Sequence, residues 1–582
     1  MSEPKFEPIA IVGRGCVLPG ALTPDALWQA VLNEENLITD APPGKWGVTD
    51  AERKAMGYKG AFVTGFDKVF NPAAHDLDGL DAADLDPVFQ WLLHAGREAW
   101  REAGQPKARK SRIGVIAGNL GYPSRALSDF AADICLDGTS PIHPQNRFNT
   151  GGPARLLARA LGASGPAFAL DAACASSLYA IKLACDRLQD HSLDIAIAAA
   201  VNGADNLILH QGFSALNALS PTGRSRPFVE GADGLVPAEG AAAIVLKRLS
   251  DCDLADRVFG VIRGIGLSND GRRKSLLAPD GDGQREAMAA AWAGSGLNPA
   301  RDIGLLEAHA TGTRTGDAVE LAATAQHFAG LEDLPIGSLK GNLGHLITAA
   351  GMASLIKLTY AVNEGIIPPT RLDGGTIAGF DGSPLTPARQ GQWPEDRPRI
   401  AALSNFGFGG NNAHLILAAD DGQRARKKPA KASQKPPHIA ITATGLSLGP
   451  DRGVAAVLQR LMRPPKDPRG PMQTTHADPK ALRAPPSDLA SAQGQQVALW
   501  DAVDEALART SLPNGARVGV FTGFACSPEA TRWMLRARIA KRLALDPSSK
   551  EADTARNTIA PPLKAGDVLG AMPNVSANRL NV

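Results

Sequence analysis

The sequence is poor in cysteine and in aromatic residues. Its 582 residues include six cysteines, and 5% of the residues are aromatic. The cysteines form no CxxC pair, so their number and spacing exclude a disulfide framework and a structural zinc site of the usual kind. We therefore expect a reducing compartment and a cytoplasmic protein.

Long apolar runs and an excess of one charge are also missing. The longest smooth apolar stretch, near residues 195–201, falls far below the roughly 20 residues that a bilayer span needs. The 61 basic and 59 acidic residues leave a net charge of +2, so no global field favours nucleic acid or an anionic membrane. We expect neither a membrane span nor a nucleic-acid partner.

Short apolar runs alternate with segments of helical period, and this alternation predicts an α/β fold. Helices are expected at residues 86–103 and 176–189, with Asp86 and Pro87 suited to the start of the first. Strands are expected at residues 8–12, 112–117, 167–171, 195–200, 241–247 and 414–417.

A basic, proline-containing segment divides the chain. Residues 419–437 hold six Arg or Lys residues and three prolines but no aromatic residue. A nucleic-acid patch would interleave stacking side chains among the charges, so a solvated tether is the better interpretation. We therefore predict a first domain at 1–418, a linker at 419–437 and a further region at 438–582.

The region after the linker repeats features of the first domain. Residues 9–11, 112–118 and 154–156 have similar counterparts at 439–441, 517–523 and 578–580. The third match is weak alone, but the constant order favours a second, incomplete copy over coincidental strand similarity. In this alignment the counterpart of Cys174 falls beyond Val582.

Two glycine motifs do not support the activities that they suggest. Gly13-x-Gly15 follows a strand, but Leu18 stands where a dinucleotide-binding loop needs its third glycine. The GxSxG string at 445–449 suggests an acyltransferase or thioesterase, yet Pro450 follows it and the repeat assigns it to a turn after a first strand.

A cysteine lies between a strand and a helix at residues 165–178. Small residues flank Cys174, and Ser176 and Ser177 suit the first turn of the helix. A helix N-terminus favours thiolate by only about 0.3 to 1 kcal/mol, so a nucleophile here needs a further partner, usually His. A buried structural role is the alternative, and it suits Cys185 on the apolar helix face better.

Two histidines follow strand-like runs in glycine-rich turns. His309 lies in EAHATGTRTGD at 307–317, and His345 ends KGNLGH at 340–345. Such turns let the backbone approach a ligand at the end of a strand. Metal binding is a weaker alternative, because no further His or Cys stands at a metal-motif spacing from either.

Together these segments resemble the β-ketoacyl synthases of polyketide and fatty-acid assembly. DAACASS around Cys174 is similar to their active-site elbow, the two histidine segments to their histidine loops, and NFGFGGNNAH at 405–414 to their C-terminal glycine loop. The resemblance covers residues 6–418 in the family's order. It implies a thiolase-like fold, with two βαβαβ halves in five αβαβα layers, and usually a dimer.

The resemblance also implies a decarboxylative Claisen condensation. Cys174 would take an acyl chain from an acyl carrier protein, and malonyl on a carrier would lose CO2 and attack it. The substrates are acyl and malonyl thioesters on carrier phosphopantetheine, with no cofactor of the enzyme's own and no metal.

Roles for individual residues follow from the same resemblance. His309 and His345 match the histidines that bind malonyl thioester, Lys340 the supporting lysine, and Glu320 the acidic residue of the first histidine loop. Thr311 and Thr313 match threonines along the pantetheine arm, and Phe406 and Phe408 the gating loop. The amides of Cys174 and Phe408 would form the oxyanion hole. Ala310 and Asn411 depart from the usual Gly and Thr.

The tandem arrangement is most similar to the synthase and chain-length-factor pair of polyunsaturated fatty acid synthases. Iterative polyketide synthases remain an alternative. The second copy would then be a noncatalytic partner in a pseudo-dimer, although a homodimer is also open. A noncatalytic scaffold is the competing hypothesis for the whole chain, and Cys174, His309 and His345 argue against it.

Overall fold

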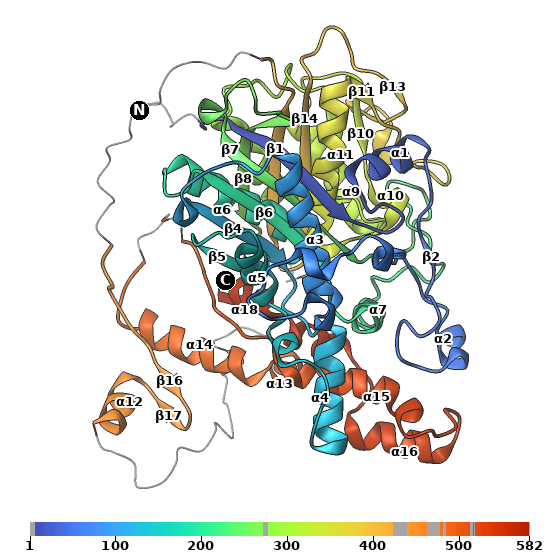
Figure 1. Cartoon of the computed structure of the whole chain (residues 1–582), viewed down its shortest axis with the longest axis vertical. Helices are drawn as coiled ribbons and strands as arrows, with labels where there is room; N and C mark the ends of the chain where they lie inside the picture. Colours follow the sequence, from blue (N-terminus) through green and yellow to red (C-terminus); the bar gives the residue numbers. More distant parts are fainter. Residues whose placement is uncertain are drawn as a thin grey trace.

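One mixed β-sheet forms the centre of the computed structural model (Figure 1). The structure describes residues 6–271, 277–422, 439–462, 478–480, 485–512, 516 and 518–580. The sheet has 11 strands in the order β12-β10-β9-β14-β15-β8-β1-β7-β6-β4-β5. Its strands are β1 (Ile9–Val17), β4 (Ile113–Asn119), β5 (Ala167–Leu170), β6 (Ile195–Asn202), β7 (Gly240–Arg248), β8 (Gly260–Asn269), β9 (Leu305–Glu307), β10 (Leu334–Gly337), β12 (Leu385–Pro387), β14 (Ile400–Gly407) and β15 (Asn411–Ala418).

The sheet consists of two halves with the same strand order. Each half has a core of five strands, and β12 adds an eleventh strand at the edge beside β10. Numbered in chain order within each half, the five strands lie side by side as third, second, fourth, fifth and first, in β5-β4-β6-β7-β1 and in β10-β9-β14-β15-β8. The halves meet where Ile9, Ala10 and Ile11 of β1 pair antiparallel with β8. This internal repeat confirms the two βαβαβ halves of the expected thiolase-like fold.

Helices complete the five layers. Helices α3 (Pro87–Glu102) and α5 (Gly152–Ala160) cover the outer face of the first half, and α8 (Gly281–Ala293) covers that of the second beside α9 (Arg314–His327). Helices α6 (Ser176–Gln189) and α11 (Ala350–Glu364) lie between the halves. Every residue of α11 from Ala350 to Val362 is buried, as a helix enclosed on all sides requires.

The elements expected for the first domain are confirmed. All six strands are present, and α3 begins after Asp86, whose side chain accepts the Val88 N–H, with Pro87 as its first residue. The remaining helices of the first domain are α1 (Pro24–Leu32), α2 (Asp50–Met56), α4 (Arg125–Asp137), α7 (Asn206–Ala215) and the single turn α10 (Lys340–Leu343). Two small hairpins pair β2 (Thr39–Asp40) with β3 (Lys59–Gly60) and β11 (Ile366–Ile367) with β13 (Gly391–Gln392). Among the described residues, no helix has both the length and the apolar character that crossing a membrane requires.

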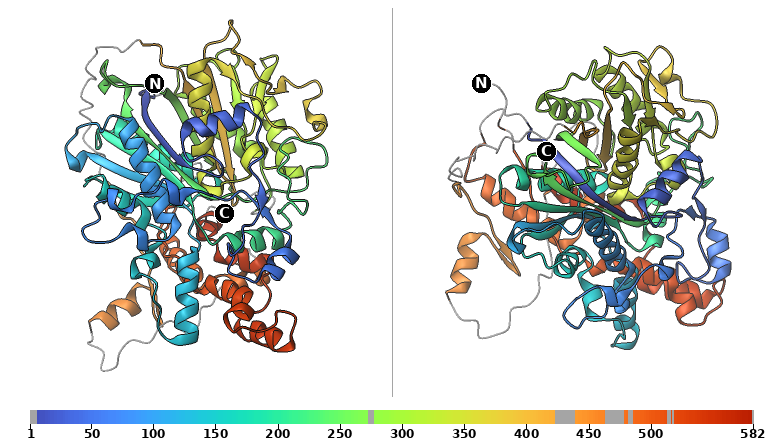
Figure 2. Two further views of the ribbon diagram at one scale, coloured as in Figure 1. Left: turned by 45° about the vertical axis from the view of Figure 1, so that its right-hand side comes forward. Right: turned by 45° about the horizontal axis from the view of Figure 1, so that its top comes forward.

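The region after residue 438 is mainly helical. Its elements are the hairpin of β16 (Ser447–Leu448) and β17 (Asp451–Arg452), and the helices α12 (Val454–Leu461), α13 (Pro486–Ser491), α14 (Gly494–Leu507), α15 (Thr531–Arg542), α16 (Lys550–Ile559), α17 (Ala565–Ala571) and α18 (Pro573–Leu580). The expected linker at 419–437 lies almost wholly outside the described residues. Figure 2 shows the red helices of this region against the blue and teal half of the sheet domain in both views.

The strands that the repeat predicts in this region are not formed. Residues 439–441 and 518–523 have no strand structure, and Ile439 and Phe521 are each 90% exposed. In the first domain, β1 pairs with β7 and β8, and β4 pairs with β5 and β6. The described part of the second region supplies no such neighbours, and a lone strand cannot satisfy its backbone groups.

Candidate active site

Cys174 lies on the predicted elbow between β5 and α6. It is the middle residue of a single 3-10 turn, Ala173–Ala175, and α6 begins at the next residue. Ala173 adopts a left-handed backbone conformation with φ of 50°. Ser176 stabilises the turn, since its hydroxyl accepts the Ala172 N–H at 2.9 Å and donates to the Ala173 carbonyl at 2.6 Å.

Two further residues support the elbow and escaped the sequence analysis. The Asn405 side chain donates to the Cys174 carbonyl at 3.0 Å, and the Asp171 carboxylate accepts the amides of Ala173 and Gly121. Asp171 and Asn405 lie within the motifs around Cys174 and the glycine loop. Their place inside these motifs was the only signal in the sequence. Spacing alone does not show which residue of a motif supports the active-site turn and which merely lies next to it.

Both predicted histidines lie beside the thiol. Nε2 of His345 is 3.0 Å from Sγ of Cys174. The ring of His309 stands edge-on to the ring of His345 at 5.4 Å and is 6.0 Å from the ring of Phe406. His309 follows β9 and His345 follows α10, so the second half of the sheet delivers both imidazoles to a cysteine of the first half.

Burial favours the neutral form of each of these three groups. It raises the pKa of the Cys174 thiol to about 12, although the Phe408 amide and the Lys340 charge act in the opposite direction. Burial and the Lys340 charge lower the pKa values of His309 and His345 well below the usual range. Burial therefore opposes the effect of the helix N-terminus at Cys174, and it favours a neutral thiol beside neutral imidazoles over an ion pair.

Lys340 is buried, and its charge acts on both histidines. Its side chain is 3% exposed, and burial lowers its pKa, against the attraction of Glu307 and Glu320. Glu307 was not predicted. Its carboxylate accepts the Leu339 amide at 2.7 Å and pairs with Lys357 at 2.5 Å, so it ties β9 to the segment before Lys340 and to α11.

Glu320 holds the first histidine loop through its backbone. Its two carboxylate oxygens accept the amides of His309 and Ala310, each at 2.7 Å, and burial raises its pKa to about 8. Asp317, which was not singled out, accepts the amides of Thr311 and Phe228 in the same way, and burial raises its pKa to about 6. Both acids lie in the motif that follows His309.

The predicted site residues line one cavity of about 680 Å³, with the exception of Lys340. Cys174, His309 and His345 line it together with Phe406 and Phe408. Thr311 and Thr313, whose hydroxyls are 3.2 Å apart, and Glu320 also face it. Predicted site residues from four separate segments of the sequence therefore meet in one cavity.

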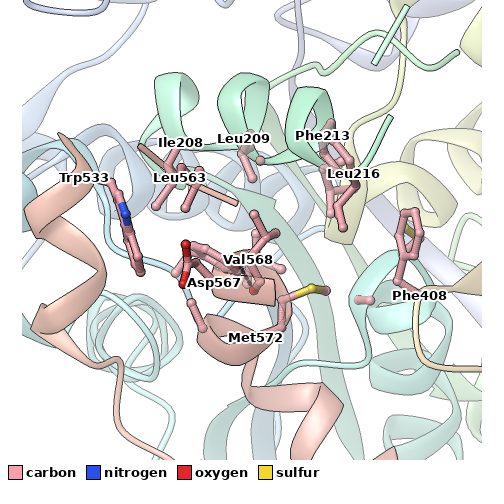
Figure 3. Close-up of a pocket in the computed structure, with 17 residues that line it drawn as sticks. Ile208, Leu209, Phe213, Leu216, Phe408, Trp533, Leu563, Asp567, Val568 and Met572 are labelled. Atoms are coloured by element: carbon pink, nitrogen blue, oxygen red, sulfur yellow. Dashed lines mark hydrogen bonds between the residues drawn. The ribbon is translucent and has the colours of Figure 1, made fainter. Parts of the chain in front are cut away.

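A second, narrower cavity of about 40 Å³ adjoins Cys174 and Phe408. Its walls come from α7 and from the region after residue 438, including Trp533, Val568 and Met572 (Figure 3). Phe408 stands at one end of this cavity and Trp533 at the other. Almost all of its lining is apolar, so it suits a hydrocarbon chain.

Cys174, His309 and His345 also form a set of ligands suited to a soft metal ion. One ligand atom from each lies within 4.8 Å of the others. Sequence spacing could not reveal this set, because its members come from three distant segments. Thiolate and imidazole are zinc ligands, but a bound ion would occupy the sulfur lone pairs that a nucleophile needs.

Two family models match the chain. The model described as Beta-ketoacyl synthase, N-terminal domain, matches residues 6–252, and Beta-ketoacyl synthase, C-terminal domain, matches residues 259–372. The chain belongs to the β-ketoacyl synthase family. Its ketosynthase domain is thus of the acyl-condensing transferase type, and ketosynthases use no cofactor of their own.

Curated relatives are polyketide synthases. A phenolphthiocerol/phthiocerol polyketide synthase of Mycobacterium tuberculosis is 37% identical over 454 residues, which cover 73% of this chain and 23% of that protein. A mycocerosic acid synthase-like polyketide synthase of Mycolicibacterium smegmatis is 34% identical, over 74% of this chain and 21% of that protein. The chain therefore spans less than a quarter of the length of these relatives.

Solved ketosynthases have the same fold. The ketosynthase from module 6 of the bacillaene synthase of Bacillus subtilis 168 covers 71% of this chain and 72% of its own, with a TM-score of 0.61 and 29% identity. The structure titled PfaC Keto synthase-Chain length factor covers 99% of this chain and 69% of its own, with a TM-score of 0.86 and 28% identity.

Proposed function

We propose that Cys174 is the nucleophile of a carrier-dependent condensation, and that His309 and His345 stabilise the malonyl-derived carbanion. The observation that carries this proposal is the convergence of one thiol and two neutral imidazoles in one cavity. In the first half-reaction the thiol attacks the acyl thioester of a carrier. His345 takes the thiol proton, and the carrier thiolate that leaves takes it in turn.

The second half-reaction needs donors rather than a base. As CO2 leaves malonyl thioester, the electron pair of the broken C–C bond forms an enolate, and the histidine N–H groups stabilise its oxygen. The enolate carbon attacks the acyl carbon on Cys174, the C–S bond breaks as the tetrahedral adduct collapses, and the released Cys174 thiolate takes a proton from water. The amides of Cys174 and Phe408 stabilise the tetrahedral oxyanion, where one donor is typically worth about 10² to 10³ in rate.

Separate cavities suit separate parts of the substrates. The larger cavity, with Thr311 and Thr313 on its wall, suits the pantetheine arm of an acyl carrier protein. The narrow apolar cavity suits the acyl chain. Because its volume is about 40 Å³, a long chain requires side chains such as Met572 to move, and Met is the most adaptable apolar residue.

We further propose that residues 438–582 are part of a second, chain-length-factor-like copy that packs on the first as a pseudo-dimer. When the two copies are aligned on the sequence repeat, the positions of α1, α3, α4 and α5 correspond to those of α12, α14, α15 and α18. The equivalent helices α4 and α15 pack against each other, as expected at a two-fold interface. The 99% coverage by the PfaC structure supports this assignment.

This tandem arrangement supports a polyunsaturated fatty acid synthase, with an iterative polyketide synthase as the alternative. We also propose a cytoplasmic location, because a reducing compartment keeps the Cys174 thiol free. Partners are an acyl carrier protein and its acyl and malonyl thioesters.

The test is a condensation assay with the protein, an acyl carrier thioester and malonyl carrier. The proposal expects a β-ketoacyl carrier product and one CO2 per product. The contradicting result is that CO2 and carrier product form no faster than without the protein, although the protein is folded and saturated with both thioesters. That result would favour the noncatalytic scaffold.

A further inference from the structure

The glycine loop beside Cys174 is in contact with the last helix of the second region. This loop, residues 408–410, connects β14 to β15. Its consecutive glycines Gly409 and Gly410 have φ values of +92° and +87°, a conformation that other residues rarely adopt. A loop of this composition has little side-chain packing of its own, so neighbouring groups determine its position.

Helix α18 supplies such groups from one face. The Asn574 side chain donates to the Phe408 carbonyl at 2.9 Å. Oδ1 of Asn578 accepts from the Asn269 side chain at 3.2 Å, and the same Nδ2 of Asn269 donates to Oδ1 of Asn411 at 3.0 Å. Asn574 and Asn578 are four residues apart, so they lie on the same face of the helix, and both are buried.

The contact with the loop is also steric. A Cβ atom on Gly409 would lie 2.0 Å from Nδ2 of Asn578 and 3.4 Å from Nδ2 of Asn574. The loop backbone therefore lies directly against the two asparagine side chains.

Phe408, whose carbonyl is bound by Asn574, lies next to the proposed nucleophile Cys174. The backbone amide of Phe408 acts on the Cys174 thiol and lowers its pKa, while the Phe408 carbonyl accepts from Asn574. The Phe408 side chain lines both cavities. A shift of the loop would therefore change two properties together: the aim of the oxyanion donor and access to the acyl cavity.

We propose that Asn574 and Asn578 are positioning residues that hold the glycine loop closed over Cys174. The second region would then set the geometry of an active site whose reacting groups belong to the first domain. This inference rests on the proposed roles of Cys174 and Phe408.

The polar atoms of the two asparagine side chains are only partly paired. Such an incomplete hydrogen-bond network suits a loop that must open. Oδ1 of Asn574 and Nδ2 of Asn578 are buried and have no hydrogen-bond partner among the described residues. Closure therefore leaves two polar atoms unpaired, and this cost offsets part of the gain from the bonds that do form. The loop can thus be released without the loss of a fully paired network.

The experiment uses Asn574→Ala and Asn578→Ala, with Asn557→Ala as the matched control. Asn557 is an exposed asparagine on α16 of the same region. Two rates are measured on the full chain: alkylation of Cys174 by iodoacetamide, followed by mass spectrometry, and self-acylation by an acyl carrier thioester. Alkylation reports access to the thiol whether or not the proposed catalytic function holds.

For each variant we expect Cys174 alkylation to rise at least about threefold, because the loop opens more often. We expect kcat of self-acylation to fall about 10- to 100-fold with little change in KM, because a misdirected oxyanion donor acts on the transition state. Asn574→Ser, which keeps a donor, should recover part of kcat, and Asn557→Ala should change neither rate.

Wild-type rates of both reactions in both variants would overturn the inference. So would an equal loss in Asn574→Ser and Asn574→Ala, because the hydrogen bond would then have no role. If the wild-type protein is alkylated at Cys174 but never acylated, the proposed function fails instead, and the alkylation rates still decide whether α18 holds the loop.

Discussion

The thiol of Cys174 and the imidazole of His345 are in contact, with Sγ and Nε2 3.0 Å apart. They come from different halves of the sheet domain, and burial opposes a charge on either group. With both groups neutral, the donor of this hydrogen bond depends on the imidazole tautomer, and the thiol donates to Nε2 when the ring proton is on Nδ1. His345 is thus in position to take the thiol proton, whereas His309 has a ring nitrogen within 4.8 Å of the sulfur but makes no hydrogen bond to it.

This arrangement predicts different effects for the two histidine substitutions. His309→Ala should retain acyl loading of Cys174 and lose condensation by at least about 10² to 10³, since it removes one donor to the enolate. His345→Ala should slow loading as well, because the thiol loses its base. Single-turnover loading and condensation rates, measured separately, test this. Equal loading by the two variants would contradict the distinction.

The raised pKa of Cys174 predicts the pH dependence of its alkylation. A raised pKa means that the thiolate forms only at high pH, so the rate should climb from pH 7 to pH 10 without reaching a plateau. Exposed Cys135 is an internal control in the same sample. Iodoacetamide labelling with site-resolved mass spectrometry measures both thiols. A plateau for Cys174 below pH 7 would indicate a thiolate–imidazolium pair.

A buried ion pair joins the second region to the first domain, and we expect its removal to lower the stability of the protein. The two terminal guanidinium nitrogens of Arg538 on α15 donate to the Asp205 carboxylate at 2.7 Å, and the two side chains are 3% and 2% exposed. Arg538→Ala leaves a buried carboxylate unpaired, which typically costs about 3 to 5 kcal/mol. Denaturant unfolding, or proteolysis of the second region, measures the effect.

The control for this ion pair is Arg101→Ala, which breaks an exposed pair with Glu98. Exposed pairs contribute about 0 to 1 kcal/mol, so this variant should unfold nearly as the wild type does. Similar losses for Arg538→Ala and Arg101→Ala would contradict the account of the interface.

The cluster of Cys174, His309 and His345 predicts inhibition by zinc. Three ligand atoms within 4.8 Å can converge on one ion, which would block the nucleophile. Zinc should inhibit acyl loading reversibly, with recovery after chelation, and Cys174→Ala should remove the tight site. Isothermal titration of the two proteins measures this, and equal zinc affinity would contradict it.

The first domain was predictable because its local signals and its packing agree. The strand around Ile9 and the helix after Asp86 have clear periodicity and caps, and both are buried as their patterns require. The convergence of Cys174, His309 and His345 was predictable only through the family resemblance, because no local pattern reports that distant turns meet.

The second region was less predictable than the first domain, because a segment forms a strand only when neighbouring strands pair with it. Ile439 and Phe521 belong to segments that match buried strands of the first domain, yet both are exposed. Helices satisfy their own backbone hydrogen bonds, so α14 and α15 form without a sheet. The contacts of Asn574 and Asp171 escaped prediction because a buried polar side chain is defined by its partner rather than by its sequence neighbours.

Mass spectrometry of acyl loading tests the central claim most directly. After incubation with an acyl carrier thioester, the wild-type protein should gain the mass of one acyl group on the peptide that contains Cys174, and Cys174→Ala should gain none. Acylation that persists on the Cys174→Ala protein would contradict the account.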